Sequence, residues 1–432
     1  MGLLTHFLFR SRQTSRLYRM APAQGITVKT RTPDSFLALN GQLDDLLCQL
    51  LRVDPVVWQQ TKVLYASGRA WNVTTRPKRR GVRTIHEPSD PLKVMSQAIL
   101  KQVIQPMPIH GCVHGGHPGT SIKTNAQVHA GFAKSYYVLD LKDAFPSTKR
   151  DRLEEYLAPK IHARISESLE IDRVEVDKIV SVLIDLMLVD DVIPQGFPTS
   201  PGVLNVVLRP TDAELSNYLR KVETELGQKF RMTRYVDDIT ISTDGEEIPP
   251  SVRKKVRKII CGNDWVLSRT KVRYYGEAEK GDSERSTKTA VVTGLVPHLD
   301  GRISVPRPKL STYRGVIYRY LEIASLRENG DEKALESARV QMEQERKLLA
   351  SAHVVIETTD LAEFYVGTWP LTTSERFKIV GIIGFLGMVY EGELPSRIRK
   401  VYLEAKVRFR IGRKAQKLAH YREKDSGTGP LS

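Results

Sequence analysis

The chain has 432 residues, of which 41% are hydrophobic and 27% are charged, a balance typical of a globular protein. This length exceeds one compact core, so we expect two or three packed units. No stretch of 18 apolar residues occurs, and we therefore expect neither a membrane-spanning helix nor a membrane partner. The three cysteines are far apart and odd in number, which argues against a disulfide framework and favours a cytoplasmic location.

The net charge of +16 predicts a polyanionic partner, because basic side chains gain free energy by releasing counterions from phosphates. The charge is concentrated in two segments. The first 33 residues hold six Lys or Arg and no acid, and Arg397–Lys424 holds eleven Lys or Arg against two acids. A membrane-surface helix is the alternative for the second segment. The first segment also has the composition of an organelle transit peptide, and either Met1 or Met20 is a candidate start.

In the first third of the chain, apolar periodicity predicts helices within residues 36–66 and at 91–103. Two strands, at 70–75 and 82–86, flank a basic turn. Residues 107–120 read as a loop rich in Gly, His and Pro.

The middle of the chain alternates helices with strands, and the last third is helical. Helices are predicted at 150–157, 166–189, 203–226 with a kink at Pro210, and 252–260, and strands at 136–141, 230–234, 239–242, 266–275 and 290–296. After Pro308 the predicted helices are 313–326, 332–352, 375–390 and 395–421. The predicted architecture is a mixed α/β body followed by a basic helical appendix.

Three aspartates lie where predicted strands end. Asp140 closes one strand, and Asp237 and Asp238 form the predicted two-residue turn of a hairpin. Templated nucleotide transfer uses two divalent cations about 3.5–4 Å apart, and hard Mg²⁺ takes oxygen ligands. The pattern therefore fits two Mg²⁺ ions, with Mn²⁺ as a substitute. An acidic pair in a turn is also common for conformational reasons alone.

Further segments around these aspartates resemble the motifs of reverse transcriptases, in the family's order and over roughly residues 70–320. Tyr235–Asp238 resembles the YxDD box, and Asp140–Ser147 resembles the first catalytic motif. Pro194–Pro201 with Asn205 is similar to the loop and helix that cradle the nucleotide, Lys271 stands at the lysine of the fourth motif, and Val292–Val296 resembles the segment before the primer grip.

The resemblance implies an α/β (α+β) protein with the right-hand architecture of polymerases. The implied parts are a basic arm at 1–36, fingers at 37–139, a palm at 140–305 with a helical fingers insertion at about 148–190, a helical basic thumb at 306–424 and a flexible tail at 425–432. It implies an RNA-directed DNA polymerase, a nucleotidyltransferase whose partners are an RNA template, its DNA product and deoxynucleoside triphosphates.

For the catalytic residues, the resemblance implies that Asp140 and Asp237 bind both metal ions and that Asp238 completes the cluster. Lys271 is a candidate general acid for the leaving pyrophosphate. Ser268 stands where the family often has Asn, which weakens the match of the fourth motif.

For nucleotide binding, the resemblance implies that Phe145 excludes a ribose 2′-hydroxyl. The pocket would be lined by Asp143, Ala144, Gln195 and Gly196, with backbone amides rather than the carboxylate of Asp143 facing the phosphates. Lys78 and Arg83 would meet the β- and γ-phosphates, a task that suits arginine because its planar fork engages two oxygens. An ordinary solvated basic turn is the alternative.

A second candidate metal site is the cluster His110, Cys112, His114 and His117. These are residue types that bind zinc, but their spacing does not pair them as CxxC or HxxxH elements. In the resembled family this position is a glycine-bearing loop, so we favour a loop over a zinc site.

Two shorter segments resemble signatures of bacterial retron reverse transcriptases. They are Asn125–His129 and Val292–Gly294, and they make Asn125, His129, Thr293 and Gly294 candidates for RNA recognition. Retron enzymes copy a structured partner RNA into branched RNA–DNA, priming from an RNA 2′-hydroxyl, and serve in antiphage defence with an effector protein. The departures are a long N-terminal arm and Val236, where Ala is common.

Two alternatives are open. A group II intron-like or abortive-infection reverse transcriptase shares the core motifs, although we find no maturase-type or HNH-like segment after the predicted thumb. A degenerate polymerase fold that only binds RNA would be expected to lose a metal aspartate, and all three are present.

Overall fold

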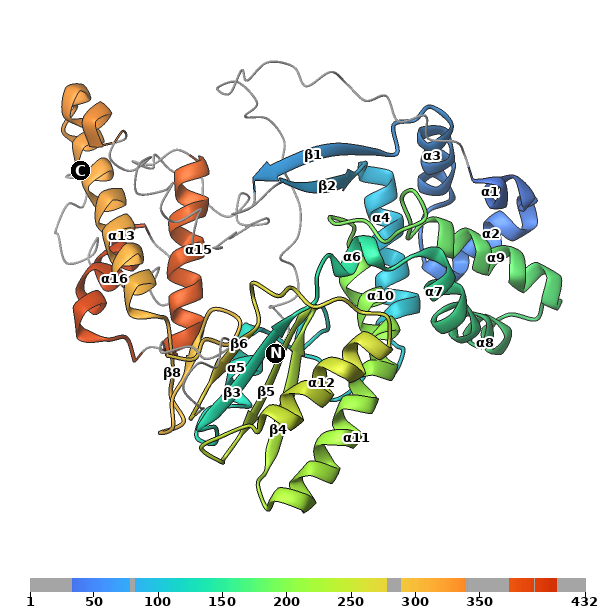
Figure 1. The fold of residues 1–432 in the computed structure, drawn as a ribbon. Coiled ribbons are helices and arrows are strands. Elements are labelled where there is room, and N and C mark those ends of the chain that lie inside the picture. The colour runs from blue at the N-terminus through green and yellow to red at the C-terminus, as the bar shows by residue number, and fades with distance from the viewer. Residues whose placement is uncertain are drawn as a thin grey trace, which may run out of the picture. The chain divides into compact units, whose positions relative to one another are not determined.

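The structure is a computed structural model that describes residues 33–77, 82–277, 289–338, 340, 373–391 and 393–409. The described residues divide into two compact units. The larger unit runs to Thr293 and includes Leu299–Gly301, and the smaller unit comprises Gly294–His298 and the residues from Arg302 onward. Figure 1 shows the elements of both units. No helix within the described ranges has the length and apolarity needed to cross a bilayer.

The larger unit begins with three helices and a two-stranded ribbon. The helices are α1 (Asp34–Ala38), α2 (Gly41–Leu51) and α3 (Pro55–Ala66). Asn40 and Asp54 each accept a backbone hydrogen bond that starts the helix they precede. The ribbon pairs β1 (Trp71–Pro77) with β2 (Val82–Pro88) in antiparallel register, and α4 (Asp90–Ile99) continues into the π-helix η1 (Leu100–Ile104).

A four-stranded antiparallel sheet forms the centre of the larger unit. Its strands are β3 (Ser135–Asp140), β4 (Phe230–Tyr235), β5 (Asp238–Thr243) and β6 (Arg273–Tyr275), in the order β4-β5-β3-β6. The helices α11 (Arg209–Leu226) and α12 (Pro250–Gly262) lie beside each other next to this sheet (Figure 1). The short helix α5 (Ile122–Gln127) contacts β4.

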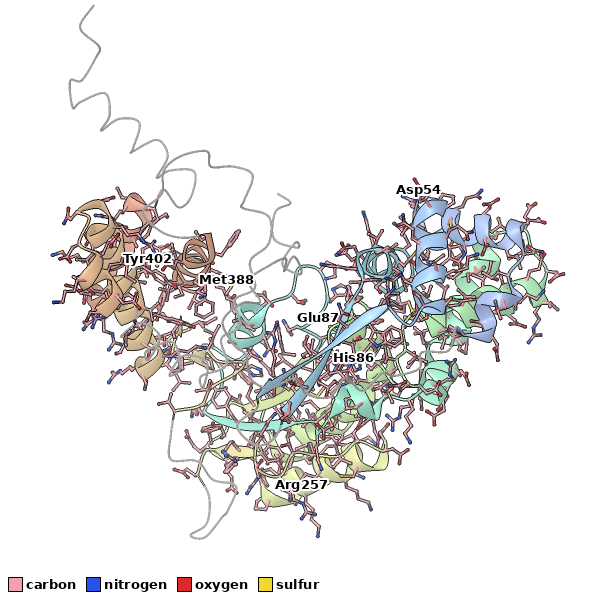
Figure 2. All side chains as sticks on the ribbon, turned by 90° about the horizontal axis from the view of Figure 1, so that it is seen from above. Asp54, His86, Glu87, Arg257, Met388 and Tyr402 are labelled. Carbon is pink, nitrogen blue, oxygen red and sulfur yellow. The ribbon has the colours of Figure 1, made fainter. Side chains whose placement is uncertain are left out.

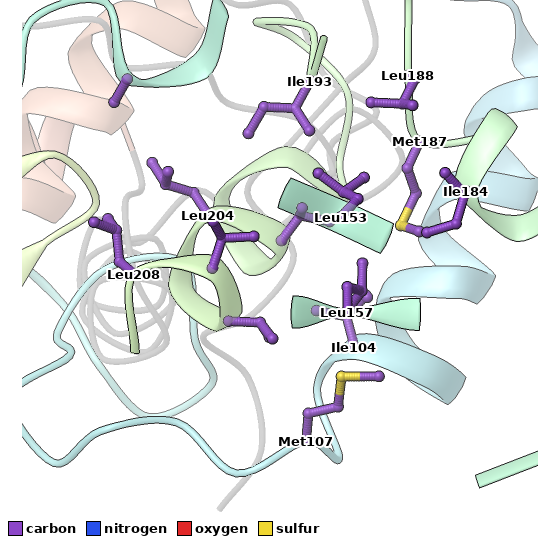
Figure 3. Close-up of a cluster of buried hydrophobic side chains, with 14 of the residues drawn as sticks. Ile104, Met107, Leu153, Leu157, Ile184, Met187, Leu188, Ile193, Leu204 and Leu208 are labelled. Carbon is purple, nitrogen blue, oxygen red and sulfur yellow. The ribbon is translucent and has the colours of Figure 1, made fainter. Parts of the chain in front are cut away.

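Five helices complete the larger unit around an apolar core. They are α6 (Ala144–Ser147), α7 (Arg150–Tyr156), α8 (Ala158–Ser168), α9 (Arg173–Asp185) and α10 (Ser200–Val207). Their buried side chains meet those of η1 in the cluster shown in Figure 3, which includes Ile104, Met107, Leu153, Leu157, Ile184, Met187, Leu188, Ile193, Leu204 and Leu208. This core supports the loop at 194–199, which leads into α10.

The smaller unit is a helical assembly with one short ribbon. It contains β7 (Val296–Pro297), β8 (Ile303–Ser304), α13 (Arg307–Glu328), α15 (Thr373–Tyr390) and α16 (Ser396–Arg408). Arg327 of α13 binds Glu375 of α15 at 2.8 Å, and Arg408 of α16 binds Glu328 at 2.6 Å. The helical character predicted after residue 308 is confirmed where the residues are described, and the remaining parts of 332–352 and 395–421 lie outside them.

Several predicted boundaries were wrong for identifiable reasons. The strand expected at 266–275 is limited to β6, because residues 268–272 form a turn closed by bonds from Lys271 N and Val272 N to Ser268 O. The strand expected at 290–296 is interrupted by the positive φ angles of Thr293 and Gly294. The helix expected from residue 166 ends at Ser168 and resumes at Arg173, and the chain divides at Leu208 while Pro210 lies in the first turn of α11.

Candidate active site

The three predicted metal aspartates lie at one end of the central sheet. Strand register places Asp140, the last residue of β3, directly opposite Asp238, the first residue of β5. The turn between β4 and β5 consists of Val236 and Asp237, so only one of the two adjacent aspartates lies in the turn and the other begins a strand. Directly opposed residues in an antiparallel pair have Cβ atoms about 4.5–5.5 Å apart. The prediction that sheet pairing brings these carboxylates together is thereby supported.

Burial and mutual repulsion act on these carboxyl groups. Burial and the charge of Asp140 raise the pKa of Asp237, and burial together with the charges of Asp237 and Asp140 raises the pKa of Asp238 to about 8. Asp140 itself is only 6% exposed. Ionised carboxylates in a poorly solvated place repel one another. A positive charge at this end of the sheet would therefore stabilise their ionised forms.

Lys271 supplies part of that charge. Its Nζ donates to Asp140 Oδ1 at 2.6 Å. Burial acts to lower the pKa of Lys271, but the hydrogen bond and charge of Asp140 raise it overall. The backbone reinforces this contact, because Ser268 N donates to Asp140 O at 2.8 Å. Lys271 is therefore next to the predicted metal site, as expected. Its ammonium group is hydrogen-bonded to Asp140, one of the predicted metal ligands.

The chemistry of this donor set fits Mg²⁺ or Mn²⁺, since it offers carboxylate oxygens crowded together without enough compensating charge. Within the part of the chain that the structure describes, no three His, Cys, Asp or Glu side chains converge closely enough to hold a metal ion together. Asp140 is instead occupied by Lys271. Metal binding would therefore require Asp140 to exchange Lys271 for the cation.

The predicted nucleotide pocket begins directly after Asp140. Asp143 is exposed and has φ of 49°, Ala144 is buried, and Phe145 is half-buried against the apolar core. The left-handed conformation at Asp143 turns the chain from β3 into α6. Phe145 therefore packs against the core, which restricts the position of its ring.

The loop carrying Gln195 and Gly196 is joined to strand β2. His86, labelled in Figure 2, donates from its backbone N to Gln195 O at 2.7 Å. Gly196 has φ of 121°, and a Cβ built there would overlap the backbone carbonyl oxygen of His86. Glycine is therefore required here both for the backbone angle and for the close approach of the two segments.

This join brings the ribbon of β1 and β2 toward the aspartates. Arg83, on β2, is exposed, and its positive charge acts to lower the pKa of Asp237. Lys78 lies outside the described residues. The shared nucleotide pocket of Arg83, the loop at Gln195 and the aspartates stays a prediction.

Two of the four predicted RNA-recognition residues, Asn125 and His129, are buried, and Thr293 and Gly294 are half-buried. Asn125 and His129 are 1% and 0% exposed. His129 is hydrogen-bonded through Nδ1 to Ser242 Oγ at 2.7 Å and through Nε2 to Thr233 Oγ1 at 2.8 Å. Both side chains are buried and hydrogen-bonded within the protein, and their part in RNA recognition stays a prediction.

The two signature segments nevertheless meet. Asn125 Nδ2 donates to Thr293 Oγ1 at 3.1 Å, and the Thr293 hydroxyl donates to Ile122 O at 3.4 Å. Thr293 and the following Gly294 both have positive φ, at 45° and 84°. Any part that Asn125 and His129 play in RNA recognition is indirect, through the position of α5 and of this turn.

The His and Cys cluster does not share a centre. His110 Nδ1 accepts from Cys112 N at 3.2 Å, His114 Nδ1 is bonded to Thr124 Oγ1 at 3.1 Å, and His117 Nδ1 is 3.0 Å from Pro118 O. Burial raises the pKa of the Cys112 thiol, with the charge of Asp212 adding to the effect. The four side chains take separate partners, in keeping with a structural loop.

One residue beside the site was missed by the motif comparison. Arg234, immediately before the YxDD box, has a fully buried side chain that is bonded to Asp212. Nothing in the sequence distinguishes Arg234 from Arg231, an exposed arginine of the same strand.

Comparison with known proteins agrees with this site. Residues 76–287 match the family described as reverse transcriptase (RNA-dependent DNA polymerase). Retron Ec73 reverse transcriptase of Escherichia coli is 34% identical over 177 residues, covering 41% of this chain and 53% of that protein. Retron Mx162 reverse transcriptase of Myxococcus xanthus is 31% identical over 264 residues, covering 56% of this chain and 51% of that protein.

Solved structures add little. Apo telomerase from Candida tropicalis aligns with a TM-score of 0.36 and 14% identity over 78% of this chain and 66% of its own. A likeness of this size supports no inference about function.

Residues 76–287 of the chain thus resemble the reverse transcriptase family, and the curated relatives are retron reverse transcriptases. Within that family the predicted resemblance to the bacterial retron type is confirmed by the curated relatives, and the predicted fold class, a mixed α and β protein of the right-hand polymerase type, is confirmed as well. The chain spans about half the length of the curated relatives named above.

Proposed function

We propose that this chain is an RNA-directed DNA polymerase of a retron. The observation that carries the proposal is the register of β3 and β5, which sets Asp140 opposite Asp238 with Asp237 in the adjoining turn. These residues lie inside the segment that matches the reverse transcriptase family. Carboxylates gathered at the end of a sheet are what a two-metal nucleotidyl transfer requires.

In this proposal Asp140 and Asp237 hold two Mg²⁺ ions and Asp238 completes the acidic cluster. The ions would activate the primer hydroxyl and neutralise the triphosphate. Lys271 serves as the general acid for pyrophosphate. Its release from Asp140 would free the ammonium group to face the leaving pyrophosphate.

The nucleotide pocket is proposed on the adjacent elements. Phe145 excludes a ribose 2′-hydroxyl from its place on the core, and Asp143 and Ala144 present backbone amides to the phosphates. The loop at Gln195 and Gly196 borders the base and sugar. Arg83 and Lys78 meet the β- and γ-phosphates, a placement supported for Arg83 by its electrostatic effect on Asp237.

The proposed partners are a structured RNA, its DNA product and deoxynucleoside triphosphates, together with an effector protein in antiphage defence. Similarity to retron enzymes supports the RNA partner. Exposed cations on the helices of the smaller unit supply a surface for phosphates, namely Arg307, Arg314, Arg397, Arg399 and Lys400. The domain boundaries follow the family, with fingers at 37–139, palm at 140–305 and thumb at 306–424.

The decisive experiment removes the metal ligands without changing side-chain size. The double variant Asp237→Asn/Asp238→Asn should abolish DNA synthesis in Mg²⁺ while RNA binding stays within a few-fold, because carboxylates hold metal and the basic surface holds phosphate. Asp190→Asn/Asp191→Asn is the matched control, since these two residues are another pair of adjacent aspartates and lie in a different turn. Full primer extension by the first variant would refute the assignment.

The retron assignment has its own test. Nucleic acid that copurifies with the protein should contain an RNA joined to complementary DNA through a 2′–5′ branch. Treatment with RNase and a debranching enzyme should shorten the product in two separable steps. Finding only linear DNA would refute the retron assignment but not the polymerase activity. A wild-type protein that binds RNA tightly and synthesises no DNA would favour the alternative of a degenerate polymerase fold that only binds RNA.

A further inference from the structure

Arg234 is the most enclosed charged side chain near the predicted metal site. It lies one residue before the end of β4 and is 0% exposed. Its Nε and Nη2 donate to the two carboxylate oxygens of Asp212 on α11 at 2.9 and 2.7 Å. Burying such a pair removes both ions from water, so the pair is weak evidence for stability by itself.

The same guanidinium also contacts the metal turn, which consists of Val236 and Asp237. Arg234 Nη1 donates to the backbone carbonyl of Val236 at 2.8 Å and to Asn205 Oδ1 at 2.9 Å. Val236 has φ of 58°, a conformation that a β-branched residue rarely adopts. The residue next to Asp237 is therefore held in a strained conformation by a buried, charge-assisted hydrogen bond.

The loop at 112–116 encloses the turn from another side. Arg234 N donates to Cys112 O at 2.7 Å, and His114 N donates to Arg234 O at 2.8 Å, as in a short parallel strand pairing. Asn205 Nδ2 donates to Gly115 O at 2.8 Å. A Cβ built on Gly115 would lie 2.8 Å from Val236 N, which leaves no room for a side chain.

We propose that Arg234 is a positioning residue for the metal turn, acting with Asp212, Asn205 and Gly115 as a clasp that fixes Val236 and thereby Asp237. The proposal rests on the proposed function, because it assigns Asp237 as a metal ligand. It also gives the loop at 112–116 a purpose other than binding zinc. Its consequence is that small changes in the clasp alter metal binding and turnover before they alter nucleic-acid binding.

The sharpest test is Gly115→Ala, which inserts one methyl group against the backbone of the turn. A displacement of about 1 Å at a catalytic group costs on the order of 100-fold, so kcat should fall at least tenfold with the template–primer Kd unchanged. Binding of Mn²⁺, measured by electron paramagnetic resonance without turnover, should weaken in parallel. Gly111→Ala is the matched control, because this glycine is in the same loop and a Cβ there meets nothing within 4 Å.

A second test separates positioning from stability. Arg234→Met/Asp212→Leu replaces the buried ion pair with apolar side chains of similar size, a change that is often neutral or stabilising. The thermal midpoint should stay near that of the wild type, while kcat and Mn²⁺ affinity fall as in Gly115→Ala. Arg234→Lys, which keeps the charge but loses the fork, should show the same losses in milder form.

The outcomes are distinguishable. Unchanged Mn²⁺ binding and kcat in both Gly115→Ala and the double variant would overturn the clasp and leave the polymerase assignment intact. A wild-type protein without DNA synthesis would defeat the proposed function, yet the Mn²⁺ titrations of Gly115→Ala and Gly111→Ala would still decide whether the clasp shapes a metal site. If the double variant does not fold, the glycine pair decides the proposal.

Discussion

The metal end of the sheet, where Asp140, Asp237 and Asp238 lie, and the ribbon of β1 and β2 are both proposed to contact the incoming nucleotide. The two regions are built differently. At the metal end, Asp140 is 6% exposed, and the turn before Asp238 accepts a hydrogen bond from the buried side chain of Arg234. The ribbon is a two-stranded sheet with exposed residues, among them Val73, Val82 and Arg83. The difference teaches that buried groups fix the turn beside the acids, whereas the proposed phosphate contacts of the ribbon depend on exposed side chains. Changes at the two places should therefore alter different kinetic constants.

The largest expected effect is at the junction of the two regions. Gly196→Ala should lower kcat/KM by on the order of 100-fold, because the new Cβ would overlap the carbonyl of His86 and displace Gln195 by roughly 1 Å. The positive φ adds a conformational cost of about 1–2 kcal/mol. Steady-state kinetics would measure the loss of kcat/KM, and thermal unfolding would measure the conformational cost.

Gly41→Ala is the control for that substitution, since a Cβ at Gly41 meets nothing within 4 Å and its φ is ordinary. It should leave both measurements close to the wild type. An unchanged nucleotide KM in Gly196→Ala would show that the join between β2 and the loop does not shape the pocket.

Arg83→Ala tests the ribbon alone. A charge-assisted phosphate contact contributes about 1.5–3 kcal/mol, so the nucleotide KM should rise roughly 10- to 100-fold while the template–primer Kd changes little. Arg69→Ala, an exposed arginine just before the other end of the ribbon, should change neither. Equal losses in both assays of Arg83→Ala would mean that the ribbon grips the template backbone instead.

Phe145→Ala should produce a smaller and more selective change. Removing the aromatic edge opens space for a 2′-hydroxyl, so the preference for deoxynucleotides should fall by roughly tenfold with little loss of DNA synthesis. Phe230→Ala removes another partly buried aromatic at the start of β4 and should not alter sugar selection. An unchanged preference in Phe145→Ala would make Phe145 a packing residue.

Much of this arrangement could be predicted from the sequence because local patterns determine it. Apolar strands ending in acids placed Asp140, Asp237 and Asp238, and the order of the motifs placed the loop at Gln195. Pairing register then brought Asp140 opposite Asp238, a consequence of two strands that are about a hundred residues apart in the chain. Periodicity reported the strands, but it carried no information about which residue begins β5.

The features that could not be predicted from the sequence are those that depend on burial in the folded protein. Arg234 looks like one more basic residue of a basic protein, and only the packing of α10, α11 and the loop at 112–116 closes it off from solvent. Asn125 and His129 stand in a signature segment that made them candidates for RNA recognition, and their hydrogen-bond partners in space, Thr293, Ser242 and Thr233, could not be predicted from it. Tertiary burial decides such roles, and periodicity does not report it.

The smallest expected effect concerns the pH dependence of folding through His129. Burial, with the nearby His114 and Arg231 adding to it, lowers the pKa of His129 from 6.5 to about 3. The unfolded chain therefore binds a proton below pH 6.5 that the folded chain does not bind, so the free energy of unfolding should fall as pH decreases from 6.5 toward 3, by about 1 kcal/mol between pH 6.5 and 5.5. His129→Gln retains a donor and an acceptor for Thr233 and Ser242, and its urea midpoint should depend less steeply on pH in this range.

The same direction of shift applies to His86, His110 and His114, whose pKa values are also lowered by burial. The wild type and His129→Gln should therefore both lose stability in acid, and the contribution of His129 is the difference between their slopes. His117→Gln, on the loop before α5, serves as the control for removing an imidazole. Parallel pH profiles for the wild type and His129→Gln would show that water or a proton reaches His129 in the folded state. That result would extend to the interior of the central sheet, at Thr233 and Ser242, the solvent access that the comparison assigns to the ribbon.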